Sequence, residues 1–109
     1  MVRALENIER FWKRAKRTGV SGNREYNPGW HTALDLTNLL TVSEAITRSA
    51  IERKESRGAQ FREDYPNKDA ALGKVNIILR KGPDGAMQVR REPIPPLPAE
   101  LQQVIKEMG

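Results

Sequence analysis

Cysteine is absent from this sequence, and histidine occurs only once, at His31. The lack of cysteine excludes disulfides, iron–sulfur clusters and thiolate zinc sites. A metal centre would have to be built from carboxylates, and no spaced set of Asp and Glu residues suggests one. We therefore expect no metal site in this chain.

Long apolar runs are also missing. No stretch approaches the roughly 20 residues that a membrane-spanning helix needs, and the first six residues lack the apolar core of a signal peptide. No Gly-x-Gly-x-x-Gly run is present, so the sequence lacks the fingerprint of a dinucleotide-binding loop. We expect a cytoplasmic protein with no direct membrane insertion.

Aromatic residues make up only 6% of the chain and hydrophobic residues 38%, which is enough for a thin core. A chain of 109 residues buries a low fraction of its surface, so we expect marginal stability without a partner. The net charge of +5 and the pI of about 9.9 fit either nucleic-acid binding or docking on an acidic partner. Charge alone does not decide between the two.

Residues 2 to about 17 have the pattern of an amphipathic helix, because Leu5, Ile8, Trp12 and Ala15 recur at helical spacing. Basic residues fill its last turns, where they offset the negative end of the helix dipole; they are Lys13, Arg14, Lys16 and Arg17. The same bases, with Trp12 nearby, could form a nucleic-acid stripe. We favour dipole compensation, because Trp12 falls on the apolar side and should point into the fold.

A second, longer helix should begin at Asn27-Pro28, where asparagine caps the free amides and proline takes the first helical position. We predict that it runs for about 30 residues and ends near Arg57-Gly58, where glycine can adopt the left-handed cap. Its apolar stripe is too wide to be buried by one neighbouring element, so the helix should lie between two neighbours. Either the C-terminal elements supply the second neighbour, or a helix of the bundle is missing.

The remainder of the chain predicts smaller elements. Residues 75–89 alternate as a β-hairpin around Gly82-Pro83-Asp84-Gly85, and 93–98 form an extended proline segment. A short helix should follow from Ala99. The predicted fold is mainly α, a spectrin-repeat-like bundle of antiparallel helices with a small hairpin and a short C-terminal helix. We divide it into a helical segment, 1–72, and a hairpin, proline and terminal-helix segment, 73–109, within one domain.

Three segments between residues 23 and 66 carry a distinctive pattern. They are Arg24-Glu25-Tyr26-Asn27-Pro28-Gly29-Trp30-His31, the apolar run from Ala33 to Ala45, and Glu55-Ser56-Arg57-Gly58-Ala59 followed by Arg62 and Asp64-Tyr65-Pro66. In these segments the chain resembles the C-terminal domain of the flavoprotein subunit of succinate dehydrogenase and fumarate reductase. One departure is Gln60, where that family usually has histidine, so this position carries no titrating group.

The resemblance implies a structural and interface domain of a larger FAD-dependent oxidoreductase that interconverts succinate and fumarate. It implies that FAD is held elsewhere in the parent protein and that the isolated chain is inactive. The implied partners are the flavin-binding domain of the same subunit and the iron–sulfur subunit, which would place the chain at the cytoplasmic face of the inner membrane. The alternatives are an L-aspartate oxidase C-terminal domain and a free-standing basic helical module that binds nucleic acid or protein.

The resemblance assigns no catalytic, cofactor-binding or metal-binding residue, but it marks an interface or structural motif made of Tyr26, Asn27, Trp30, His31, Glu55, Arg57, Gly58, Arg62 and Asp64. We expect the four charged members to pin the end of the long helix to the next loop or to the flavin domain; the alternative is a solvated helix end. His31 should be a packing or hydrogen-bonding group, and Trp30 a core or docking aromatic. The isolated chain should self-associate through the stripe of residues 36–51.

Overall fold

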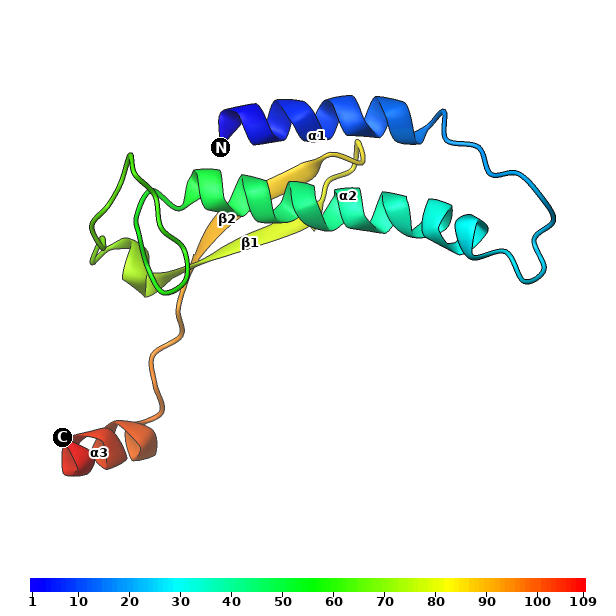
Figure 1. The fold of residues 1–109 in the computed structure, drawn as a ribbon. Coiled ribbons are helices and arrows are strands. Elements are labelled where there is room, and N and C mark those ends of the chain that lie inside the picture. The colour runs from blue at the N-terminus through cyan, green and yellow to red at the C-terminus, as the bar shows by residue number, and fades with distance from the viewer.

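The computed structural model describes all 109 residues and contains three α-helices and one β-hairpin (Figure 1). In chain order the elements are α1 (Val2–Ala15), α2 (Pro28–Glu52), a 3-10 turn (Leu72–Lys74), β1 (Val75–Lys81), β2 (Met87–Pro93) and α3 (Ala99–Met108). α1 lies antiparallel against α2, and the hairpin packs on α2 from another side. The predicted fold class, a mainly α arrangement with a hairpin and a short C-terminal helix, is confirmed.

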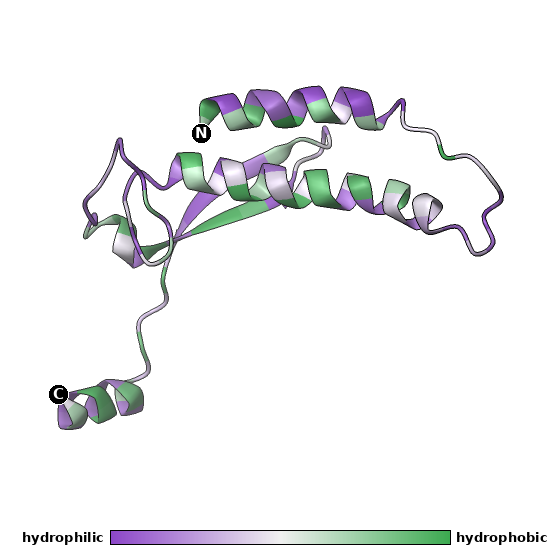
Figure 2. Cartoon of the chain, in the orientation of Figure 1, coloured by the Kyte–Doolittle hydropathy of each residue, from purple (hydrophilic) through white to green (hydrophobic).

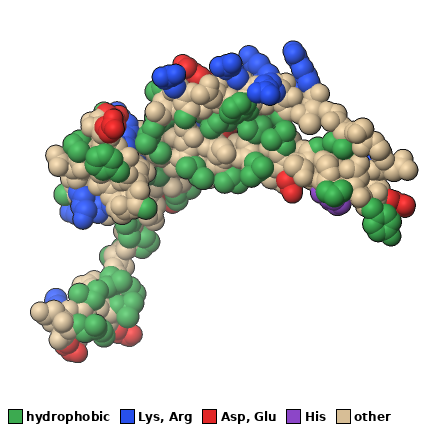
Figure 3. Space-filling model, in the orientation of Figure 1, with side chains coloured by type: hydrophobic (Ala, Val, Ile, Leu, Met, Phe, Trp, Pro, Cys, Tyr) green, Lys and Arg blue, Asp and Glu red, His purple; other side chains and the backbone are tan.

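The first helix follows its predicted pattern but ends at Ala15, slightly before the expected end near residue 17. Its apolar side faces α2, where Ile8 is buried and Trp12 is half-buried. The polar side carries the basic residues along the outside of the molecule, as the space-filling view shows (Figure 3). The hydropathy cartoon shows the same division between the two sides of α1 (Figure 2).

The long helix begins at Pro28, as predicted, but it ends at Glu52 and not near Arg57-Gly58. It therefore has 25 residues instead of about 30. The chain leaves the helix at Arg53, which adopts extended backbone angles of φ −81° and ψ 94°. The reason is tertiary: Arg62, which lies outside the helix, donates to the carbonyls of Ala50 and Ile51 in its last turn. Gly58 does have a positive φ of 59°, but it lies in a separate tight turn.

The predicted β-hairpin is present, and its strands pair with Val75 opposite Pro93 and Lys81 opposite Met87. Its turn is closed by the Gly82 amide, which donates to the Ala86 carbonyl at 2.8 Å. The Asp84 side chain accepts from the Ala86 amide at 3.1 Å, and Gly85 supplies the positive φ of 83° that the turn requires.

The core is thin, because only seven of the 109 residues are buried and three of these are large apolar residues, Ile8, Leu40 and Leu72. The hairpin supplies the second neighbour that the breadth of α2 predicted. α3 supplies none: it has no buried residue and stands away from the other elements at the end of the proline segment (Figure 1). The molecule is correspondingly elongated, measuring 63 × 33 × 29 Å. None of its helices combines the length and apolarity needed to cross a membrane.

Candidate functional site

Glu55 lies at the centre of an ionic cluster just beyond the end of α2. Its side chain has 0% exposure. One carboxylate oxygen accepts from Arg53 Nη1 at 2.6 Å and from Arg57 Nε at 2.9 Å, and the other accepts from the Asp69 amide at 2.8 Å. The hydrogen bond from Arg57 is the main reason that the Glu55 pKa falls from 4.5 to about 2, against the opposing effect of burial. Glu55 is therefore a permanent anion at neutral pH.

The two arginines that hold Glu55 also reach the following loop. Arg53 donates from Nη1 to the Leu72 carbonyl at 3.1 Å and from Nη2 to the Val75 carbonyl at 3.0 Å. Arg57 donates from Nη2 to the Asp69 carbonyl at 2.9 Å. Through Glu55, the end of α2 is thereby joined to the 3-10 turn and to the start of β1.

Arg62 forms the second half of the cluster and is only 7% exposed. Its Nη1 donates to the carbonyls of Ala50, Ile51 and Arg53 at 2.7, 3.1 and 3.1 Å, which satisfies the C-terminal end of α2. The other side of the guanidinium binds Asp64 in a bidentate fork, with distances of 2.9 and 2.6 Å. This pairing with Arg62 lowers the Asp64 pKa.

Uncharged groups complete the loop. Ser56 Oγ accepts from the Arg62 amide at 2.8 Å and donates to the Tyr65 carbonyl at 2.8 Å. Gln60 Nε2 donates to the carbonyls of both Arg53 and Glu55, at 3.3 Å each. An amide side chain is therefore the donor at this position, where the flavoprotein family usually has histidine. No buried side-chain nitrogen or oxygen lacks a hydrogen-bond partner.

The cluster therefore brings together four of the nine marked residues: Glu55, Arg57, Arg62 and Asp64. Gly58 lies beside it, in the tight turn closed between Arg57 and Gln60. Sequence reasoning missed Asp69 as a member. A local feature could have indicated Asp69, because its side chain accepts from the amides of Ala71 and Leu72, at 2.7 and 3.2 Å, where the 3-10 turn begins. Such an arrangement fixes backbone geometry, because each charged group is held by neighbours that also bind the main chain.

The other four marked residues lie at the opposite end of α2. Asn27 caps the helix by accepting from the Gly29 amide at 3.1 Å, and its amide nitrogen binds the Ser21 and Asn23 carbonyls. Trp30 and His31 meet edge to face at 5.3 Å between ring centroids, and His31 is exposed. Tyr26 is 99% exposed, with a φ of 52° that is rare for a tyrosine.

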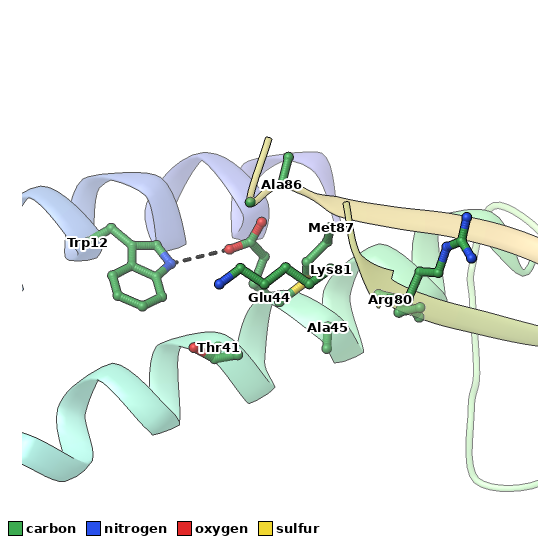
Figure 4. Close-up of a pocket in the computed structure, with 10 residues that line it drawn as sticks. Trp12, Thr41, Glu44, Ala45, Arg80, Lys81, Ala86 and Met87 are labelled. Carbon is green, nitrogen blue, oxygen red and sulfur yellow. Dashed lines mark hydrogen bonds between the residues drawn. The ribbon is translucent and has the colours of Figure 1, made fainter. Parts of the chain in front are cut away.

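A groove of about 630 Å³ lies between the helix pair and the hairpin (Figure 4). The one acidic residue that lines it is Glu44, which accepts from Trp12 Nε1 at 3.2 Å and from Arg48 Nε at 2.8 Å. The Trp12 ring is thus turned inward, as its helical position predicted, and away from the basic side of α1.

A flavin dinucleotide would need a site for its pyrophosphate. The hairpin is antiparallel, and no glycine-rich loop leads from a strand into a helix to cradle a pyrophosphate. The chain therefore does not fit FAD, and no chemical step through a flavin follows from its residues. No group of three or more acidic or histidine side chains is placed to hold a metal ion either.

Comparison with known proteins shows the family. A family model described as "Fumarate reductase flavoprotein C-term" matches residues 1–104. The fumarate reductase flavoprotein subunit of Haemophilus influenzae is 34% identical over 95 residues, which are 86% of this chain and 16% of that protein. The L-aspartate oxidase of Streptomyces coelicolor is 26% identical over 98 residues, which are 90% of this chain and 17% of that protein.

A solved structure agrees with these sequence relationships. Mycobacterium smegmatis Sdh1 in complex with UQ1 matches this fold with a TM-score of 0.82 and 32% identity, over 94% of this chain and 18% of that one. The chain spans about a sixth of the length of the curated fumarate reductase relatives that it matches. It belongs to the fumarate reductase flavoprotein C-terminal family, and it is a C-terminal domain of the succinate dehydrogenase and fumarate reductase flavoprotein subunit.

Proposed function

We propose that this domain is a scaffold and docking element of an FAD-dependent oxidoreductase that interconverts succinate and fumarate, and that it supplies no catalytic residue. The proposal rests on two features that occur together: a loop held by a hydrogen-bonded ionic cluster, and apolar side chains that no element of this chain covers. The ionic cluster leaves no buried polar group unpaired, yet only seven residues are buried. A domain built in this way is suited to being covered by a neighbour.

The surface proposed for docking is an exposed apolar row along α2 made of Leu39, Val42 and Ile46. These residues recur at helical spacing and face neither α1 nor the hairpin with their full surface, since each remains more than half exposed. We assign this row to the flavin-binding domain of the same subunit. The iron–sulfur subunit would lie nearby, and through such partners the chain would sit at the cytoplasmic face of the inner membrane.

The ionic cluster would hold the loop of residues 53–74 in the shape that the neighbour recognises. Phe61 lies in this loop and is 69% exposed, although the residues on either side of it, Gln60 and Arg62, are held by hydrogen bonds. A fixed loop that presents an exposed aromatic is a favourable docking feature, because little conformational entropy is lost when it binds. In this proposal residues 1–72 provide the docking surface, and within 73–109 the hairpin braces it.

Co-expression tests this function. The flavin-binding region of M. smegmatis Sdh1, ended before the region that this chain matches, is produced together with the chain. We expect the two to co-purify in a 1:1 ratio with bound FAD. Leu39→Asp should abolish co-purification, because it buries a charge at the contact. Asn38→Asp, which adds the same charge at the adjacent exposed position, should not.

Absence of a complex with the unaltered chain, or equal loss with both variants, would contradict the docking function. The alternative is tested by a change of partner. Co-purification with the corresponding flavin-binding region of the S. coelicolor L-aspartate oxidase, and not with that of Sdh1, would favour the L-aspartate oxidase alternative.

When this chain is produced alone, the apolar stripe on α2 has no neighbour to cover it. We therefore propose that the isolated chain self-associates, as its apolar pattern over residues 36–51 suggested. Two of these residues, Val42 and Ile46, are 57% and 64% exposed. Exposed apolar area of this kind lowers its free energy by association with a second copy.

A further inference from the structure

α3 is an amphipathic helix without an intramolecular partner. Its apolar side consists of Leu101, Val104, Ile105 and Met108, which are between 46% and 83% exposed. Along one edge of that side lie Glu100 and Glu107, seven residues apart and thus about 10.5 Å apart along the axis. Neither glutamate is in a salt bridge. Figure 3 shows the apolar side chains of α3 open to solvent.

A groove between α1 and α2 offers the complementary surface. It has a volume of about 550 Å³ and is floored by apolar residues, Phe11, Leu36 and Leu40. Arg14 and Arg17 line it on the α1 side. Arg10 extends this basic edge by one turn, so that Arg10 and Arg17 are also seven residues apart. None of these three arginines is in a salt bridge.

The two surfaces match in both chemistry and spacing. Each combines an apolar strip with charges on one edge at seven-residue intervals, and the charges are of opposite sign. This is the arrangement by which paired helices select a partner, with apolar residues in the seam and ion pairs beside it. The groove lies along the α1 C-terminus, whereas β2 ends beside Val75 at the other end of α2.

The linker between β2 and α3 favours a contact with another molecule. It runs from Ile94 to Pro98 and contains three prolines, and a fourth, Pro93, ends β2. Proline fixes φ and favours an extended backbone, so the linker acts as a semi-rigid spacer that holds α3 away from the helix pair and hairpin of the same chain. Such a spacer is suited to delivering α3 to a neighbouring molecule.

We propose that α3 of one copy docks in the α1–α2 groove of a second copy, and that the exchange is reciprocal. The inference rests on the proposed self-association and names the segments that make it. Reciprocal exchange buries two helix–groove contacts at once, which brings the interface toward the roughly 1,200–2,000 Å² of a specific complex. It also covers Leu36, a half-buried residue of the apolar stripe on α2.

Charge exchange tests the inference. The first variant, Arg10→Glu/Arg17→Glu, makes the groove edge acidic; the second, Glu100→Arg/Glu107→Arg, makes α3 basic. Each variant alone faces like charges, so its dimerisation should weaken by roughly 100-fold, at about threefold for each of four reversed pairs. An equimolar mixture should regain the wild-type dimer mass in sedimentation velocity, because each α3 then meets a groove of opposite charge.

Lys13→Glu/Lys16→Glu is the matched control, since it changes the charge by the same amount on the side of α1 that is opposite the groove residues Phe11 and Ala15. It should dimerise like the wild type. If both charge variants remain dimeric, the copies associate through another surface and the exchange of α3 is wrong, while self-association stands. A wild-type monomer at all concentrations, or a mixture that stays monomeric, also overturns the exchange. None of these results bears on docking to the flavin-binding region, which co-purification tests separately.

Discussion

Replacing Arg62 by methionine should destabilise the domain more than the same substitution at any other arginine. Methionine keeps much of the length and apolar stem of arginine but removes every hydrogen bond of the guanidinium. The carbonyls of Ala50 and Ile51, at the end of α2, then lose their donor. Water cannot easily replace this donor, because the site is nearly closed to solvent: the Arg62 side chain that fills it is only 7% exposed.

The magnitude follows from the contacts. Arg62 Nη1 has two hydrogens for three carbonyls, so it counts as two charged hydrogen bonds of about 1.5–3 kcal/mol each. The pair with Asp64 adds less than about 1 kcal/mol, because the Asp64 side chain is 62% exposed. We therefore expect a loss of about 3–6 kcal/mol. This is a large part of the roughly 5–15 kcal/mol that stabilises a typical domain.

Urea denaturation followed by circular dichroism measures the effect. Arg90→Met is the matched control, because Arg90 pairs with Glu92 on the exposed hairpin and should cost less than about 1 kcal/mol. Arg62→Lys should recover only part of the loss, since an ammonium cannot make the bidentate fork. If Arg62→Met and Arg90→Met change the free energy of unfolding equally, the reasoning on the helix end is refuted.

Two further predictions concern the same cluster. The pKa of Glu55 is about 2 in the folded chain and 4.5 for the free side chain, so its contribution to stability is complete above pH 4.5 and is lost as the pH falls toward 2. Denaturant midpoints should therefore fall across this pH range. Glu55→Gln should flatten this dependence on pH, and an unchanged slope in the variant would contradict the role of Glu55. Gly73→Ala should destabilise the fold, because its added Cβ would lie 2.7 Å from Arg57 Nη2. In the control Gly19→Ala the added Cβ has no atom within 4 Å, so the free energy of unfolding should rise by about 0.4–1 kcal/mol. Equal thermal midpoints for the two variants would show that Arg57 moves aside without cost.

Much of the local structure was predictable from the sequence, because its causes are local. The start of α2 depends on Asn27 and Pro28, two neighbours whose capping chemistry acts within one turn. The hairpin depends on alternation and on the Gly82–Gly85 turn. The resemblance to the flavoprotein family rests on contiguous motifs, and it was confirmed by the family model and by the fold of M. smegmatis Sdh1.

The end of α2 was predicted wrongly for a reason that sequence reasoning could not supply. Gly58 has the positive φ that a helix cap uses, yet the helix ends six residues earlier, at Glu52. The end is decided by Arg62, which approaches from the next loop and takes the last carbonyls. A helix end that is satisfied by a distant side chain carries no local signal.

The sequence by itself determined which segments are helical, where the turns lie and which family the chain belongs to, since each depends on neighbouring residues and their spacing. Only the tertiary structure decided that Glu55 is the buried centre of the cluster, that Asp69 joins it, and that the hairpin and not α3 covers the second side of α2. These outcomes depend on which distant groups meet, because burial and ion pairing are properties of the packed chain and not of any one segment.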